Sequence, residues 1–157
     1  MSSRFIFCAT TEADTERLGQ ALAKVLGDGG VVALQGPLGA GKTRLVQAIA
    51  AARGIDRRDV VSPTFVLMHE YPGPRPIYHL DAYRLRDEDD FFQLGAHEHF
   101  GPPNLVCIEW AERVAGSLPE DRLEIVISVL ANDGRQFEIV GRGTLESAVE
   151  RIRAEIR

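Results

Sequence analysis

Residues 36–43 read Gly-Pro-Leu-Gly-Ala-Gly-Lys-Thr, which is a complete Walker A phosphate-binding loop. Glycines in such a loop let the backbone turn its amide groups inward, where they form a nest for phosphate oxygens. Lys42 is expected to reach the β- and γ-phosphates of a nucleotide, and the Thr43 hydroxyl to ligate Mg²⁺. The residues predicted to bind phosphate are Gly36, Leu38, Gly39, Ala40, Gly41, Lys42 and Thr43.

The flanking sequence fits a loop between a strand and a helix, as this motif requires. Residues 31–34 are a short apolar run that is typical of a buried parallel strand. After the loop, apolar residues recur at helical spacing up to Ala52, and Gly54 follows where a helix C-cap belongs. The dipole of this helix would point at the phosphates.

Hydrophobic periodicity and turn residues locate the other elements. Asn132-Asp133-Gly134 is a strong hairpin signal, and prolines make residues 72–76 a loop. The order of elements predicts an α/β fold in which residues 1–157 form one P-loop NTPase domain, with a mixed, mostly parallel central sheet flanked by helices and antiparallel hairpin strands. The predicted strands are residues 5–8, 31–34, 60–61, 65–71, 77–83, 105–108, 122–130 and 135–140, and the predicted helices start at Thr10 or Thr11, after the phosphate-binding loop, near Asp87 and near Thr144.

Composition and charge exclude several classes of protein. The 157 residues carry a net charge of −5, which argues against binding nucleic acid alone through a broad basic face. Cys8 and Cys107 lie in separate apolar segments without metal-binding spacing, and both are predicted to be buried thiols. Without a signal-peptide pattern or an apolar run of membrane-span length, a cytoplasmic protein with no membrane association is expected.

The strand predicted at residues 105–108 ends in Glu109 and Trp110. An apolar strand that closes on an acid is the Walker B pattern, and its carboxylate would lie beside the phosphate-binding loop. There Glu109 would hold Mg²⁺, directly or through water, or orient an attacking water; an ordinary strand-end acid is the alternative. Trp110 would pack near the nucleotide base, form part of a docking face for a partner, or fill the core.

Polar side chains alternate along the strand predicted at residues 77–83. His79, Asp81 and Tyr83 would therefore point to one face of the sheet. Asp81 is the candidate for positioning water or for an indirect Mg²⁺ contact, and Arg84 would pair with it or touch phosphate. A solvated outer face is the alternative.

The tetrapeptide Ser62-Pro63-Thr64-Phe65 lies between the Walker A helix and the next predicted strand. Thr64 resembles the threonine of the sensing loop in nucleotide switches, which binds Mg²⁺ or the γ-phosphate. Ordinary turn chemistry is the alternative. His97-Glu98-His99 lacks the spacing of a metalloprotease motif and is predicted to be a solvated surface.

Four motifs together resemble the TsaE family, the small bacterial ATPases of threonylcarbamoyladenosine synthesis on tRNA. Their order and approximate spacing match over roughly residues 12–135. Each motif alone is widely shared, but the set of four is far more specific. The motifs are the Walker A loop at residues 36–43, Ser62-Pro63-Thr64-Phe65, His79-Leu80-Asp81-Ala82-Tyr83-Arg84, and Ile108-Glu109-Trp110.

The resemblance implies a P-loop ATPase that binds ATP with Mg²⁺ and works with the TsaB–TsaD heterodimer. A domain this small, without an evident lid or arginine finger, is expected to be weak alone. In that family the transfer of the threonylcarbamoyl group to the adenosine next to the anticodon is attributed to TsaD. The ATPase would therefore meet tRNA only indirectly, through the complex, and would reset the complex for another round.

The resemblance also implies roles for individual residues. Lys42 and the loop amides would bind phosphates, and Thr43 and Glu109 would hold Mg²⁺. The expected catalytic residues are Lys42, Thr64, Asp81 and Glu109, and the expected nucleotide-binding residues outside the Walker A loop are Thr11, Glu12, Trp110 and Arg135.

Two other functions are compatible with the sequence. A small-molecule kinase would need a lid with arginines, for which Arg57-Arg58 is the nearest candidate. A non-catalytic docking module would use nucleotide binding alone to change its affinity for a partner. A GTPase is disfavoured because the chain has neither an Asn-Lys-x-Asp nor an Asp-x-x-Gly motif.

Overall fold

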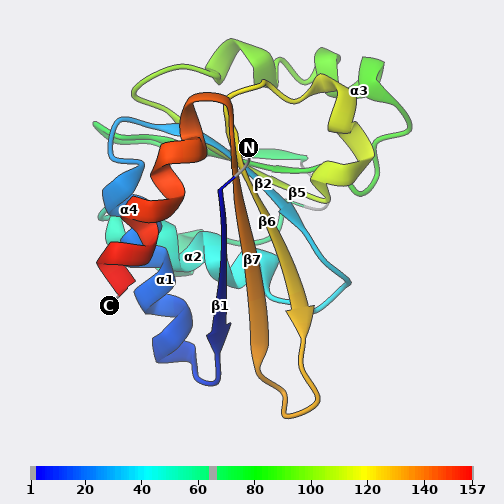
Figure 1. Ribbon diagram of the computed structural model, residues 1–157. Helices are drawn as coiled ribbons and strands as arrows, with labels where there is room; N and C mark the ends of the chain where they lie inside the picture. The colour runs from blue at the N-terminus through cyan, green and yellow to red at the C-terminus, as the bar shows by residue number, and fades with distance from the viewer. Residues whose placement is uncertain (1–2, 64–66, 157) are drawn as a thin grey trace.

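Seven strands form a sheet in the order β1-β7-β6-β2-β5-β4-β3. Figure 1 shows this sheet in the computed structural model, which describes residues 3–63 and 67–156. The central strands β6, β2, β5 and β4 run parallel, whereas β1, β7 and β3 join by antiparallel pairing. The predicted mixed α/β sheet with hairpin strands is therefore confirmed. The strands are β1 (Arg4–Ala9), β2 (Gly30–Gln35), β3 (Met68–Tyr71), β4 (Ile77–Asp81), β5 (Leu105–Glu109), β6 (Arg122–Val129) and β7 (Arg135–Arg142).

Helical segments cover both faces of the sheet. Helices α1 (Glu12–Val25), α2 (Lys42–Ala52) and α4 (Glu146–Ile156) pack together on one face (Figure 1). The short helix α3 (Glu88–Gln93) lies on the other face, together with the 3₁₀ segments η2 (Ala96–His99) and η3 (Ala111–Ser117). The other 3₁₀ segments of the described chain are η1 (Arg57–Asp59) and η4 (Gly143–Leu145).

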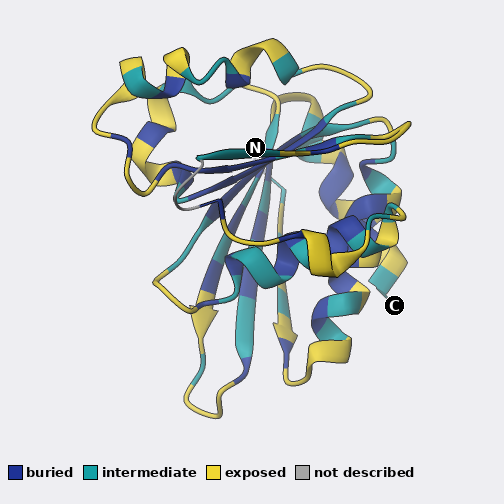
Figure 2. Ribbon diagram, turned by 180° about the vertical axis from the view of Figure 1, so that it is seen from behind, coloured by how far each residue is buried: buried dark blue, intermediate teal, exposed yellow. Residues whose placement is uncertain are grey.

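Each face of the sheet has its own apolar core. On one face, Leu18 of α1 and Ile49 of α2 belong to the same buried cluster as Leu34 of β2. On the other, Phe91 of α3 and Ile108 of β5 belong to a second buried cluster. Figure 2 shows the buried residues concentrated in the middle strands and on the inner sides of the helices. Strands β2 and β5 are therefore buried on both faces, as their continuous apolar sequences predict, whereas β6 alternates between buried and less buried residues.

The helix boundaries follow the predicted capping residues. Thr11 caps α1: its hydroxyl accepts a hydrogen bond from the Asp14 amide at 3.2 Å, and the Asp14 carboxylate accepts one from the Thr11 amide at 3.2 Å. Asp87 caps α3 through one bond, which its carboxylate accepts from the Asp90 amide at 2.9 Å. Gly54 follows α2 with a φ of 86°, a left-handed conformation that favours glycine at a helix end.

The strand predicted at Val60 and Val61 is wrong. Val60 directly follows η1 and is fully buried, but neither residue pairs with a strand. Side chains approach their carbonyl groups instead: Gln47 Nε2 donates to the Val60 oxygen at 2.9 Å, and Tyr71 Oη lies 3.5 Å from the Val61 oxygen. Burial outside the sheet therefore accounts for the apolar character of Val60, whereas Val61 is exposed.

The strands β3 and β4 are shorter than the predicted residues 65–71 and 77–83. The start of the first prediction falls partly outside the described residues, and β3 begins at Met68. At the other end, β4 stops at Asp81, whose carboxylate accepts a hydrogen bond from the Tyr83 amide at 2.9 Å. This side-chain bond to the backbone two residues ahead closes a turn and ends the strand. Tyr83 is consequently not part of the strand, contrary to the prediction.

The two cysteines differ in exposure. Cys107 is buried in β5 as predicted, but Cys8 is exposed. The prediction fails for Cys8 because the side chains of β1 alternate between the two faces of the sheet, and Cys8 shares its exposed side with Ile6. Among residues 3–63 and 67–156, no helix combines the length and apolar character needed to cross a membrane.

Candidate active site

Three parallel strands bring the predicted chemical groups to one edge of the sheet. Strand β2 leads directly into the Walker A loop, β4 ends at Asp81 and β5 ends at Glu109. In the sheet register Glu109 is paired with Leu34 on one side and with Asp81 on the other. The carboxyl ends of the strands therefore gather both acids beside the loop, as expected for this sheet type.

The Walker A loop wraps the N-terminus of α2. Gly41 precedes the helix with a φ of 111°, and Gly36 begins the loop with a φ of 152°. A Cβ atom on Gly36 would lie 2.7 Å from the Ile127 carbonyl oxygen of β6, so a side chain does not fit there. The loop therefore depends on glycine for its path, and the N-terminus of α2 that follows it is the kind of helix end that binds anions.

Lys42 is folded back into the loop. Its ammonium group donates to the carbonyl oxygens of Gly36 at 2.6 Å and Pro37 at 3.0 Å, and it lies 4.0 Å from the centre of the Trp110 ring. Burial lowers the pKa of Lys42, while nearby carboxylates, that of Glu109 first, act in the opposite direction. The ammonium is thus held within the loop by two carbonyl oxygens and the Trp110 ring.

Thr43 and Glu109 form the pair expected to hold Mg²⁺. The Thr43 hydroxyl donates to Glu109 Oε2 at 2.7 Å, although the residues come from α2 and β5. Hydroxyl and carboxylate oxygens are hard ligands that suit Mg²⁺, which takes its other ligands from phosphates and water. Within the described residues, no group of three His, Cys, Asp or Glu side chains could hold a metal.

Asp81 lies in the same pocket as this pair. The pocket has a volume of about 450 Å³, and Asp81 is only 4% exposed at its wall. The alternative of a solvated outer face is therefore wrong for Asp81, and also for His79, which is fully buried. The lining residues are Leu38, Gly39, Gly41, Lys42, Thr43, Arg44, Ser62, Asp81, Tyr83, Arg84, Glu109 and Trp110.

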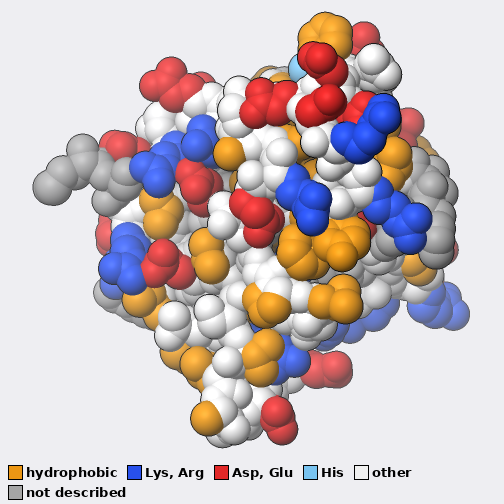
Figure 3. All heavy atoms as spheres, turned by 90° about the vertical axis from the view of Figure 1, so that its right-hand side faces the viewer, with side chains coloured by type: hydrophobic (Ala, Val, Ile, Leu, Met, Phe, Trp, Pro, Cys, Tyr) orange, Lys and Arg blue, Asp and Glu red, His pale blue; other side chains and the backbone are white. Residues whose placement is uncertain are grey.

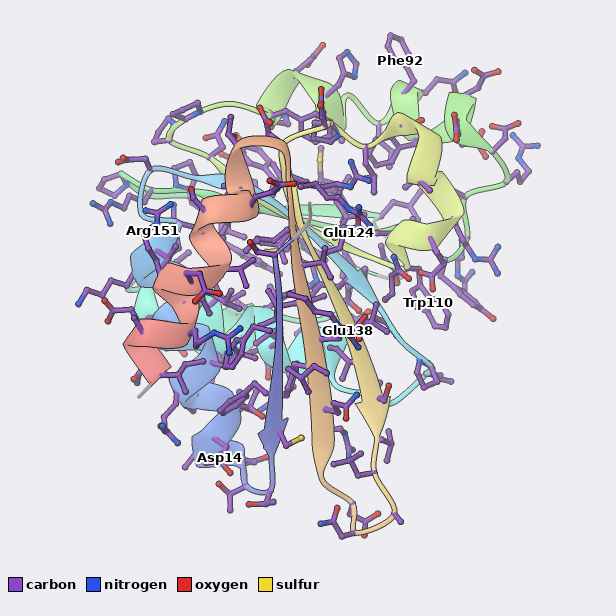
Figure 4. The ribbon with its side chains drawn as sticks, viewed as in Figure 1. Asp14, Phe92, Trp110, Glu124, Glu138 and Arg151 are labelled. Atoms are coloured by element: carbon purple, nitrogen blue, oxygen red, sulfur yellow. The ribbon has the colours of Figure 1, made fainter. Side chains whose placement is uncertain are left out.

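Trp110 is placed at the rim of this pocket. It is partly buried, and its ring lies 4.8 Å from that of Tyr83, which is 47% exposed. Figure 4 shows Trp110 on the side of the molecule away from α1, whose first turn is marked by Asp14. Of the roles considered for Trp110, core filling alone does not describe this position.

A second pocket lies across the Walker A loop and brings together residues distant in sequence. Its volume is about 410 Å³, and Thr11, Glu12 and Arg135 all line it. Arg135 at the start of β7 donates from Nε to the Ala40 carbonyl oxygen at 2.9 Å and so braces the loop. Arg44, which lines both pockets, was not among the predicted site residues. Its position directly after Thr43 was the available signal.

Comparison with known proteins identifies the family. A family model described as "Threonylcarbamoyl adenosine biosynthesis protein TsaE" matches residues 9–137. The chain belongs to the TsaE family. The matched range includes every residue predicted for the site, of which Thr64 lies outside the described residues.

Relatives in the TsaE family match most of the chain. The protein named "tRNA threonylcarbamoyladenosine biosynthesis protein TsaE" from Treponema pallidum is 42% identical over 133 residues, covering 84% of this chain and 98% of that protein. The protein of that name from Bacillus subtilis is 37% identical over 131 residues, covering 83% and 81%. A crystal structure of Bacillus subtilis YdiB superposes with a TM-score of 0.79 at 27% identity, covering 100% of this chain and 99% of that one.

Proposed function

We propose that this protein is a Mg²⁺-dependent ATPase of tRNA threonylcarbamoyladenosine biosynthesis that acts in the cytoplasm. The observation that carries the proposal is the 2.7 Å hydrogen bond between Thr43 and Glu109, beside Lys42 in the Walker A loop of a TsaE family member. The relatives' names, which all refer to this tRNA modification, support the pathway. The paired loop and acid support nucleotide hydrolysis.

In the proposed reaction, Lys42 and the residues around it have separate roles. Lys42 leaves its two carbonyl partners and binds the β- and γ-phosphates together with the loop amides. Thr43 and Glu109 hold Mg²⁺, which would neutralise charge on the transferred phosphoryl group. Asp81, the other acid in this pocket, orients the attacking water. Thr64 would sense the γ-phosphate, as the sequence motif suggests.

The two pockets suggest how the nucleotide would lie. Gly39 and Gly41 line both, so a single ligand can cross the loop from one pocket to the other. The triphosphate would occupy the side of Asp81 and Glu109. The base and ribose would then occupy the side lined by Thr11, Glu12 and Arg135, in agreement with the roles expected for these three residues. Trp110 would thus lie near the phosphates rather than near the base.

The surface around the phosphate pocket is suited to a protein partner. Leu38 at the loop tip is 89% exposed and Tyr83 is 47% exposed. Figure 3 looks onto this side of the molecule and shows hydrophobic side chains gathered next to basic ones. Exposed apolar groups of this kind mark interaction sites. We assign this surface to docking on the TsaB–TsaD heterodimer, through which tRNA would be met, with hydrolysis resetting the complex for turnover.

The proposal is tested by steady-state ATP hydrolysis, measured for the protein alone and with purified TsaB–TsaD. Weak activity that TsaB–TsaD stimulates is expected for the wild type. Lys42→Ala should abolish activity, whereas Lys24→Ala, at the chain's one other lysine, should not, because Lys24 is exposed and pairs with Glu155 of α4. Absence of both hydrolysis and TsaB–TsaD binding would contradict the proposal and favour phosphate transfer to a metabolite.

A further inference from the structure

A buried row of side chains leads away from the proposed Mg²⁺ site. The Tyr71 hydroxyl lies 3.0 Å from His79 Nδ1, and His79 Nε2 lies 2.5 Å from Glu109 Oε2. His79 is fully buried and Tyr71 is 5% exposed. The row therefore joins the strands β3, β4 and β5 behind the pocket, where neither a nucleotide nor water reaches His79.

The chemistry of the three groups determines which atom donates in each contact. A carboxylate only accepts hydrogen bonds, so His79 Nε2 must carry a proton and donate it to Glu109. In a neutral imidazole the other nitrogen then accepts. The Tyr71 hydroxyl is its donor, because it lies closer to Nδ1, at 3.0 Å, than to the Val61 carbonyl oxygen, at 3.5 Å. Burial raises the pKa of Tyr71 to about 12, so that the phenol keeps the proton that this contact needs.

Of the hydrogen bonds that Thr43 and His79 donate to Glu109, a bound metal ion would leave the one from His79 in place. Glu109 Oε2 accepts hydrogen bonds from both Thr43 and His79. When Thr43 turns its oxygen to a metal ion, its contact with Glu109 must change, whereas His79 lies behind the carboxylate and outside the pocket lining. A partner of this kind fixes the orientation of a ligating carboxylate.

We propose that His79, oriented by Tyr71, is a positioning residue that fixes the Glu109 carboxylate for Mg²⁺ binding. The inference rests on the proposed function, because it concerns the same Mg²⁺–nucleotide site. It goes beyond that function by adding two residues that touch neither the nucleotide nor the metal. Loss of such a contact around a metal site typically lowers metal affinity by about 10- to 100-fold.

Two substitutions of His79 separate positioning from packing. Glutamine places its amide near the position of Nε2 and keeps a donor for Glu109, whereas asparagine places its amide near Nδ1 and keeps only the Tyr71 contact. Both are smaller than histidine and polar, so they should destabilise the fold to a similar degree. Tyr71→Phe removes the orienting hydroxyl with the ring retained, and Tyr78→Phe is its control, because the Tyr78 hydroxyl contacts Glu70 at the surface.

The experiment is calorimetric titration of Mg²⁺ into each variant saturated with ADP, beside ADP binding without Mg²⁺. His79→Asn should lower Mg²⁺ affinity by about tenfold or more, His79→Gln by less than about threefold, and Tyr71→Phe by about threefold. ADP binding without Mg²⁺ should stay unchanged in all variants, as should the Mg²⁺ affinity of Tyr78→Phe. In hydrolysis assays at fixed Mg²⁺, His79→Asn should lower kcat and leave the KM for ATP unchanged.

Several results would overturn the inference. Equal Mg²⁺ affinity in His79→Asn and His79→Gln, with similar losses of stability, would give His79 a purely structural role. If His79→Asn does not fold, the test rests on Tyr71→Phe. A Mg²⁺ affinity equal to that of the wild type in this variant would contradict the positioning role. Failure of the wild type to bind ADP or ATP would instead reject the proposed function, so the two failures are distinguishable.

Discussion

The ammonium of Lys42 lies 4.0 Å from the centre of the Trp110 ring, in the same pocket as Thr43 and Glu109. Trp110 is the chain's one tryptophan, so its fluorescence reports on this site alone. When Lys42 moves to bind phosphate, the cation leaves the ring and the emission should change. We expect a saturable change in tryptophan fluorescence as ATP is titrated into the protein.

Lys42→Ala provides the control for this experiment. It removes the cation and should abolish the ATP-dependent change, whereas Lys24→Ala should retain it. A wild-type signal that is insensitive to ATP, while calorimetry detects binding, would place Trp110 apart from the bound phosphates.

Asp81→Asn should slow hydrolysis without weakening ATP binding. The amide oxygen can still accept the hydrogen bond from the Tyr83 amide, so the turn after β4 is preserved. The capacity to accept a proton from water is lost, and we expect kcat to fall by about 100-fold with the Kd for ATP changed by less than about twofold. Asp89→Asn on the exposed side of α3 is the matched control. Normal hydrolysis by Asp81→Asn would remove Asp81 from the mechanism.

Sequence motifs predicted the parts of the site whose residue types are set by chemistry. The Walker A loop needs glycine, Lys42 and Thr43 at fixed spacing, and in a chain with such a loop an apolar strand that ends in Glu109 is typical of a Walker B strand. Parallel topology then places the strand ends together, which is how the acids meet the loop. The motifs and the meeting of the strand ends could therefore be predicted without knowing which side chains are in contact.

The contacts of Tyr71 and His79 could not be predicted in this way. They depend on the register of β3 against β4, in which His79 is paired with His69 and Tyr71 with Ile77. A shift of one residue would turn each side chain to the other face. The exposure of Cys8 was missed for a similar reason, since the apolar sequence around it does not show that one face of β1 is exposed.

Gly19→Ala should destabilise the protein because α1 and α2 touch at this residue. A Cβ atom on Gly19 would lie 2.4 Å from Ala48 Cβ, closer than two carbon atoms approach without a shift of the backbone. We expect a loss of about 1–3 kcal/mol in the free energy of unfolding, measured with urea. Gly101→Ala, where no atom lies within 4 Å, should change it by less than about 0.5 kcal/mol. A more stable Gly19→Ala variant would mean that the helices are not in close contact.

Stability should fall as the pH rises above about 9, and Cys107 should account for the first part of the fall. Burial raises the pKa of Cys107 from 9.0 to about 12, so between these values the folded protein keeps a proton that the unfolded chain releases. Because the native state then binds more protons than the unfolded state, the free energy of unfolding decreases with pH, by up to about 1.4 kcal/mol per pH unit for one group. Tyr71 adds to the slope only above its ordinary value of 10.0.

The measurement is urea unfolding at pH 8, 9 and 10 for the wild type, Cys107→Ala and Cys8→Ala. Cys107→Ala should lower stability at every pH through lost packing, but its curve should be flatter between pH 9 and 10, before Tyr71 contributes. Cys8 is exposed and should leave the wild-type slope unchanged when replaced. Parallel curves for all three proteins would show that the Cys107 thiol ionises as readily in the folded as in the unfolded chain, which would contradict its burial in β5.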